Sequence, residues 1–445
     1  MKKIIFLSSL IIGCASLFAQ TLSLEQVRTL ALANSRSLAK YNLAVTSTIL
    51  DERTRLFSTL PSLSLGANAS MSLWNAQNAA PVENPFDTFS SGASISVSQK
   101  IFEGGRTLIQ KAINEIASKS AKKDALAEYF NVLDSADNAY YSVLEAMAVL
   151  EAEESSLKTA LTSLSIAEVR QRNGMINQGD YLKAMADKET RENSRNQAKR
   201  NLTLNMMKLR ALTGLSDLPE LQQIDFSGYE GLISRLGNVS DNEADLLYVE
   251  LWKAVVSVNP SLAKAGLASQ RAENNLSMTQ RGYSPSLSAS FSTGLNYSPN
   301  NEIEMSGGRL SINLSIPVDY WVIANNVAKN RIARDSAALD YVSVEVNLET
   351  ELQSALLNVF TYAGSVLNTG LSLTYSERHF EYVLERYRLS QSSITDLNDA
   401  STLLINSRNN LIKARYGFLQ SLSKLRSLGV FADEEKLIEI LMGNR

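Results

Sequence analysis

The sequence predicts a mainly α-helical fold in which duplicated, long antiparallel helical hairpins carry a small transmembrane β-sheet of four strands per chain. The first observation is an internal duplication, because Pro61–Ser64 (PSLS) recurs as Pro285–Ser288 at an offset of 224 residues. Such self-similarity indicates two copies of one structural unit. The second observation is that residues 106–218 and 318–445 contain no proline, which leaves room for very long helices.

Composition excludes several classes of function. The 445 residues carry 43 Lys and Arg against 46 Asp and Glu, a net charge of -3, which gives no basis for nucleic-acid binding. The chain has one Cys and one His, so most metal sites and Cys/His nucleophiles are excluded. We therefore expect neither an enzyme nor a metal or other cofactor, and a secreted enzyme is only a remote alternative.

The first 19 residues have the pattern of a secretory signal peptide: Lys2 and Lys3, an apolar run, and then small residues. Two cleavage sites compete. Cys14 ends a segment that resembles a bacterial lipobox and would then be lipidated, whereas Ala19 suits ordinary cleavage. The apolar Leu17 and Phe18 favour cleavage after Ala19, because a polar tether usually follows a lipidated Cys.

The duplication divides the mature chain into two similar repeats. The first, at 20–213, is expected to contain a helix, two strands, a long helix and a return helix. A Gly-, Asp- and Asn-rich connecting segment at 214–246 has no counterpart in the other half. The second repeat is expected at 247–429, and a C-terminal segment follows at 430–445.

Four segments alternate between apolar and polar residues as half-buried strands do. They lie at 62–73, 93–98, 286–296 and 310–316. The first is about ten residues long, which suits a tilted membrane-spanning strand. The polar faces consist of small uncharged residues, as expected beside a water-filled lumen. The alternative is an ordinary soluble sheet with one wet face.

Strand counting predicts an oligomer. Four strands cannot close a barrel, and open sheet edges cannot face lipid. Two copies would give 8 strands and three would give 12. Because an eight-stranded barrel is filled by its own side chains, a pore favours the homotrimer with a 12-strand β-barrel.

Long helices are predicted at 106–172 and 322–388, each about 67 residues or about 100 Å long. Apolar residues at seven-residue spacing, such as Val143, Leu150 and Leu157, indicate a coiled-coil seam. Return helices are expected at 180–213 and 396–428, and a shorter helix before each first strand. The result is a rod of paired helices next to a small sheet.

Several motifs of this sequence resemble those of a known protein family. Ile394–Ala400 (ITDLNDA) has its first-half counterpart around Asp180 and Ala184, and the junction Ile101–Arg106 contains Gly104 and Gly105. With these motifs in the same order twice, the chain resembles the TolC-like outer-membrane efflux proteins over essentially its whole mature length. In that family Gly104 and Gly105 would form the strand-to-helix turn.

The resemblance implies a homotrimer whose 12-strand β-barrel lies in outer-membrane lipid and whose 12-helix α-barrel crosses the periplasm. It implies a passive exit duct that docks with a periplasmic adaptor protein and an inner-membrane pump and exports drugs, small molecules or proteins. The alternative is a structural periplasmic or surface coiled coil without a pore, which would not need four alternating strands.

The resemblance also implies a periplasmic tip closed by converging helix pairs. Asp396 and Asp399 match its ring of carboxylates, and Asp180 and Tyr387 match two members of a polar latch. Ser392 stands where the family has the latch Arg. Tyr387 is then expected to donate to Asp180 of a neighbouring hairpin, while Ser392 supplies no charge, so closure is expected to be weaker.

Physical chemistry gives these residues more than one interpretation. Six carboxylates around a narrow mouth would raise one another's pKa values and attract cations. Asp396 equally suits a helix cap, and Asp399 suits the positive end of the helix dipole. Tyr387 continues the heptad pattern, so packing alone also accounts for it. Ser390 occupies the position of the family's usual tip Gly.

Overall fold

The computed structural model describes residues 21–75, 80–82, 84–298 and 301–443. Cys14 and the predicted signal peptide lie outside these residues. The chain forms two compact units. The first contains the residues up to Leu38, Glu128–Asn259 and the residues from Glu349 onward, and the second contains Ala39–Ala127 and Pro260–Leu348. Each unit contains segments from both halves of the chain, so the two units do not correspond to the two predicted repeats. The boundaries of the repeats stay a prediction.

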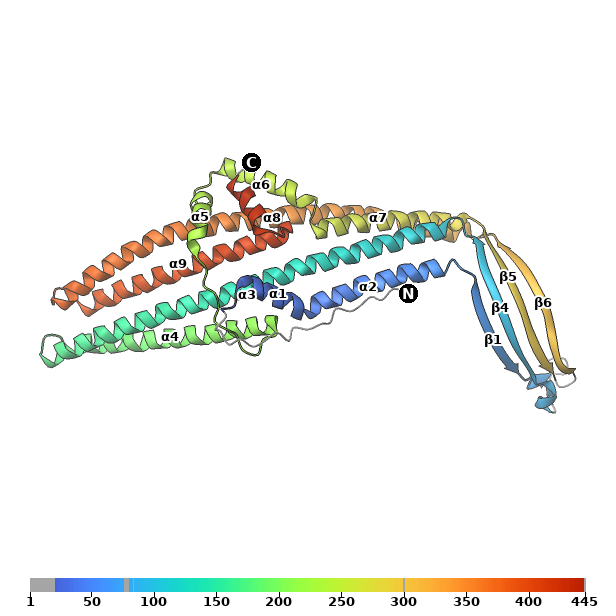
Figure 1. Cartoon of the computed structure of the whole chain (residues 1–445), viewed down its shortest axis with the longest axis horizontal. Coiled ribbons are helices and arrows are strands. Elements are labelled where there is room, and N and C mark those ends of the chain that lie inside the picture. The colour runs from blue at the N-terminus through green and yellow to red at the C-terminus, as the bar shows by residue number, and fades with distance from the viewer. Residues whose placement is uncertain (1–20, 76–79, 83, 299–300, 444–445) are drawn as a thin grey trace. The chain divides into compact units, whose positions relative to one another are not determined.

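The second unit holds an antiparallel sheet of four strands in the order β1-β4-β5-β6 (Figure 1). The strands are β1 (Ser62–Ser70), β4 (Ser90–Phe102), β5 (Ser286–Ser298) and β6 (Asn301–Ser315). Two-residue strands β2 (Trp74–Asn75) and β3 (Ala80–Pro81) pair separately, and the 3-10 turn η1 (Pro85–Thr88) follows them. Among the described residues, β1 and β6 are the two edges of this sheet, and no strand pairs with the outer side of either.

Strand alternation places apolar side chains on one face of this sheet. In the register, Leu65 opposes Ile95 and Phe291 opposes Leu310, and all four are exposed. A soluble sheet would bury such residues in a core, whereas a membrane sheet turns them toward lipid. The arrangement therefore suits a lipid-facing surface.

The polar face differs from the prediction in one respect. β6 begins at Asn301, nine residues before the predicted strand, and this extension brings Glu304 and Arg309 onto the polar face opposite Asn296 and Ser292. Lys100 also lies on this face, opposite Ser288. The expectation of a polar face without charges was wrong, because β4 and β6 extend beyond the predicted segments and the extensions carry the charged residues. In β6 an irregularity of the pairing at Gly307 and Gly308 hides this extension from the simple alternation.

Helices account for the rest of the fold. They are α1 (Leu24–Asn34), α2 (Arg36–Phe57), α3 (Arg106–Arg172), α4 (Gln178–Thr213), α5 (Glu230–Leu236), α6 (Asp241–Val256), α7 (Pro260–Gln280), α8 (Tyr320–Arg388), α9 (Ile394–Gly429) and α10 (Glu434–Met442), with short turns η2 (Phe226–Tyr229) and η3 (Arg281–Tyr283). This element order confirms the predicted class of duplicated hairpins with a four-stranded sheet. No described helix combines the length and apolar character that a membrane crossing requires.

The two hairpins of the first unit are α3/α4 and α8/α9. Within the first, the Asn205 side chain donates to the Ser142 carbonyl, at 3.2 Å. Within the second, the Ser376 and Ser407 hydroxyls lie 2.8 Å apart in a buried position. These polar contacts sit between largely apolar helix faces and fix how each pair of helices aligns.

A buried network of charged residues joins α1 and α9 to α3. Asp137 is fully buried and accepts two hydrogen bonds from Arg28, at 2.6 and 2.8 Å. Arg426 and Ser423 of α9 donate to the same carboxylate, at 3.0 and 2.8 Å. Arg28 also pairs with Glu25 on its own helix. One carboxylate of α3 therefore holds both α1 and α9.

Candidate functional site

The candidate site of the first unit lies where its hairpins turn. α3 ends at Arg172 and α4 begins at Gln178, while α8 ends at Arg388 and α9 begins at Ile394. Each turn needs one residue with positive φ, which is Gly174 at 70° in the first and Ser390 at 62° in the second. A side chain at such a position costs roughly 1–2 kcal/mol. The serine at the second turn is therefore less favourable than glycine would be.

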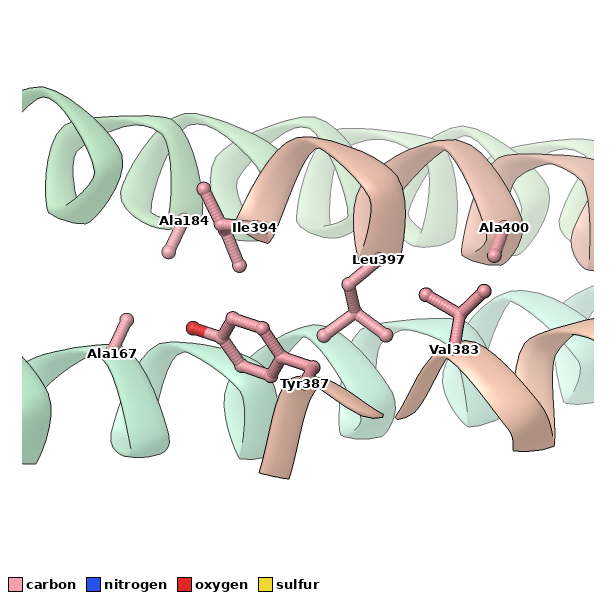
Figure 2. Packing of buried hydrophobic residues seen from close by; sticks show 7 residues of the cluster. All are labelled: Ala167, Ala184, Val383, Tyr387, Ile394, Leu397 and Ala400. Atoms are coloured by element: carbon pink, nitrogen blue, oxygen red, sulfur yellow. The ribbon is translucent and has the colours of Figure 1, made fainter. Parts of the chain in front are cut away.

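A buried apolar cluster packs the two turns together (Figure 2). All four helices of the hairpins contribute to it. Its members are Ala167, Ala184, Val383, Tyr387, Ile394, Leu397 and Ala400. The small alanines allow close approach of the backbones, and Tyr387 is the largest side chain of the cluster, with 1 % of its surface exposed. Packing is thus one part of Tyr387's role.

Arg170 is the cation that contacts Tyr387. Its guanidinium lies over the Tyr387 ring, 4.4 Å from the ring centre. The same group donates to the backbone carbonyl of Tyr387 and, at 3.2 Å, to that of Arg388. These carbonyls belong to the last turn of α8, where acceptors lack helical partners and the helix dipole is negative. A side chain of one hairpin therefore caps the other.

The Tyr387 hydroxyl has no hydrogen-bond partner among the described residues. Burial raises the pKa of Tyr387, Arg170 opposes the rise, and the carboxylate of Asp180 adds to it. Asp180 pairs with Lys183 at 3.8 Å, and Lys183 donates to the Thr395 hydroxyl at 3.1 Å. Within one chain, a further link between the hairpins near this turn therefore runs through Lys183. The latch role of Tyr387 and Asp180 stays a prediction about neighbouring chains.

Asp396 forms a capping box at the start of α9. It accepts from the backbone N–H of Ser393 at 2.9 Å and from the Ser392 hydroxyl at 3.0 Å, and its own N–H donates to the Ser393 hydroxyl. Asp399 lies one turn further along, and both carboxylates are exposed. Ser392 thus serves the cap. Asp396 caps the helix and is exposed at the same time, so the cap is compatible with the predicted position in a carboxylate ring.

The capping donors decide the charge of Asp396. Hydrogen bonds from the backbone and the hydroxyl of Ser393, and then from Ser392, lower the pKa of Asp396 below its ordinary value of 3.8. Because the folded-state pKa is lowered, this cap contributes stability at pH above that value and loses it as the pH falls further. Within one chain the cap therefore favours the ionised form of Asp396.

The strand-to-helix junction belongs to the second unit. Gly104 and Gly105 have φ of 63° and 80° between β4 and α3. A Cβ on Gly104 would lie 2.4 Å from the Cβ of Ser284. Both the backbone conformation and the space therefore require glycine there. This is a structural reason for the motif that the sequence analysis singled out.

Sequence reasoning missed Arg170 and Lys183. One signal was available for Arg170. Later in the repeats the offset is 216 residues, as from Asp180 to Asp396, and this offset pairs Arg170 with Arg386. Arg386 lies over the Tyr382 ring, at 5.7 Å, and donates to the Gln391 carbonyl at 3.1 Å. The two arginines thus occupy equivalent positions but make different contacts within one chain.

Comparison with known proteins decides the family. The model of a family described as outer membrane efflux protein matches residues 27–215 and 252–429, well over half of the chain. The chain belongs to the outer membrane efflux protein family. It is therefore an outer-membrane efflux channel whose helices extend into the periplasm, which confirms the predicted exit duct and its localisation.

The proteins most relevant for comparison with this efflux protein are outer-membrane proteins as well. Outer membrane protein TolC of Escherichia coli (strain K12) is 23% identical over 405 residues, which cover 85% of this chain and 76% of that one. The Campylobacter jejuni CmeC outer membrane channel superposes with a TM-score of 0.74 at 17% identity, over 94% of this chain and 89% of that one. The outer membrane protein VceC of Vibrio cholerae gives 0.73 at 16% identity, over 91% and 96%. The solved structures share the fold.

Proposed function

We propose that three copies of this chain form the exit duct of a tripartite efflux or type I secretion system. The duct docks with a periplasmic adaptor protein and an inner-membrane pump and passes drugs, small molecules or proteins. The observation that carries the proposal is the open sheet, whose edge strands β1 and β6 have unpaired backbone groups next to an apolar face. In lipid these groups need partners, and another copy supplies them.

Three copies give twelve strands, enough to enclose a water-filled lumen lined by the polar face. The hairpins would close the periplasmic end in the same symmetry. Arg170 joins the two hairpins of each chain, so an opening movement that separates these hairpins must break its contacts. A pump chooses the cargo, and the duct provides the route.

The mass of the purified complex in detergent tests the assembly. We expect three chains, and we expect the same preparation to form channels in planar bilayers. A heat-denatured sample is the control for incidental bilayer leakage. Channels formed by a monomer or a dimer would contradict the trimeric barrel.

We expect the double variant Asp396→Asn with Asp399→Asn to lose most of the cation preference and the block by divalent cations. In a trimer the two residues place six carboxylates near one mouth, and such a cluster of negative charge attracts cations. Reversal potentials in a salt gradient, with and without added divalent cations, measure both effects.

Asp399→Asn alone is the matched control, because it leaves the capping box intact. If the charges act through the pore, it should remove part of the preference without changing thermal stability. Unchanged selectivity and unchanged block in the double variant would show that the two carboxylates only stabilise the start of α9.

A further inference from the structure

Two adjacent rows of residues cross the polar face of the sheet, one residue from each strand. Seven of these eight residues are serines, and the eighth is Arg309. In the first row, residues from all four strands align in register: Ser62, Ser98, Ser290 and Ser311. The second row, two residues further along each strand, consists of Ser64, Ser96, Ser292 and Arg309. Serines contribute little volume, so the long Arg309 side chain extends beyond its neighbours. It lies near mid-height of the sheet.

Arg309 is the cation of this face that lacks a carboxylate partner among the described residues. Its side chain is exposed, and it makes no ion pair with any of them. The other cation, Lys100, pairs with Glu103 at 2.6 Å. Glu304 lies two rows away, about 13 Å along the strands at 3.3 Å per residue. The positive charge at the Arg309 row is therefore uncompensated locally.

We propose that Arg309 makes the β-sheet part of the duct favour anionic over cationic solutes. The proposal deepens the proposed function and rests on its barrel, which turns the polar face of the sheet toward the lumen. Three copies of Arg309 would then stand at one level of the lumen, one from each chain. Anionic solutes gain local concentration there, and cationic solutes lose it.

This preference is opposite in sign to the one expected at the tip. The carboxylates of Asp396 and Asp399 attract cations to the periplasmic end, whereas Arg309 attracts anions in the membrane part. In the proposed duct the two levels act in series, so the total conductance reports both of them. The influence of Arg309 must therefore be measured locally, inside the sheet.

A cysteine at Ser292 provides a local sensor, because Ser292 pairs directly with Arg309 across the β5–β6 ladder. The trimer carrying Ser292→Cys is treated with two water-soluble thiol reagents of similar size, an anionic sulfonate and a cationic trimethylammonium compound. The ratio of their rates reports the local potential. A change in the pKa of the thiol affects both rates alike and cancels in the ratio.

Adding Arg309→Gln should lower the anion-to-cation rate ratio about fivefold at low salt, for a charge about 8 Å from the sulfur in water. The effect should shrink at physiological salt, where the screening length is about 8 Å. Arg309→Lys should keep most of the ratio. An unchanged ratio in Arg309→Gln would overturn the proposal.

A cysteine at Leu310 separates this outcome from failure of the barrel. Leu310 follows Arg309 and lies on the apolar face, so in a lipid-embedded barrel it should resist both reagents. If Leu310→Cys reacts as fast as Ser292→Cys, the proposed barrel fails. If Leu310→Cys is protected and the Ser292→Cys ratio ignores Arg309, the barrel stands and only the role of Arg309 is lost. The chain without added cysteines controls for reaction at Cys14.

Discussion

Replacing Asp137 with Ala is expected to destabilise the fold by about 3–5 kcal/mol, because removing one partner of a buried ion pair leaves the other charge uncompensated. Two guanidinium groups would lose that partner. Arg28 and Arg426 are 8 % and 4 % exposed, and both donate to this one carboxylate. Unfolding in guanidinium chloride, followed by circular dichroism in detergent, measures the loss.

Asp335→Ala is the matched control for Asp137→Ala. Asp335 also pairs with an arginine, Arg334, at 2.7 Å, but both side chains are substantially exposed. Exposed pairs contribute at most about 1 kcal/mol. Asp137→Asn tests the same site with the side-chain size retained and should also destabilise the fold. Equal stability of the Asp137 and Asp335 variants would mean that the buried network does not hold α1 and α9.

Replacing Arg170 with Gln is expected to raise the resting conductance of the channel. A hydrogen bond to a charged group contributes about 1.5–3 kcal/mol, and Arg170 donates to two carbonyls and stacks on Tyr387. If this energy favours the closed tip, its loss should raise the open-to-closed ratio by roughly 10- to 100-fold. Single-channel recording in planar bilayers measures this ratio.

Arg172→Gln is the matched control, because Arg172 lies two residues further along, is exposed, and pairs with Glu168 on its own helix. It should leave the conductance unchanged. Tyr387→Phe distinguishes packing from a latch, since it removes only the hydroxyl. A conductance rise in Tyr387→Phe would require a partner from another chain, because the hydroxyl has none among the described residues of its own. Wild-type conductance in Arg170→Gln would show that packing alone closes the tip.

The sequence predicted the helices well and the tip contacts poorly. Both ends of α3 were predicted at Arg106 and Arg172, because local signals mark them: Gly104 and Gly105 before the helix and Gly174 after it. The beginning of β6 was predicted too late, because the pairing irregularity near Gly307 hides the alternation. The ends of an element are therefore predicted correctly where the local sequence pattern is regular and incorrectly where an irregularity interrupts it.

The contacts of the candidate site could not be predicted from local patterns, because they join residues far apart in the sequence. Asp396 and Asp180 were found because a family motif marks them, whereas Arg170 acts on Tyr387, 217 residues away in the sequence. The Asp137 network joins residues separated by 109 and 289 positions. A helix pattern shows which face is apolar, but it does not show which cation reaches which carbonyl on another hairpin.

The Asp137 network also has a consequence for the order of folding during secretion. Its last member, Arg426, lies 289 residues after Asp137 and 398 residues after Arg28 in the sequence. Contacts between residues so far apart in sequence form slowly, and until then apolar surface is exposed to aggregation. The chain must therefore leave the cytoplasm as far as Arg426 before α1 gains its full anchor. A chain that terminates before Arg426 should remain dependent on periplasmic holding chaperones and be cleared by proteases.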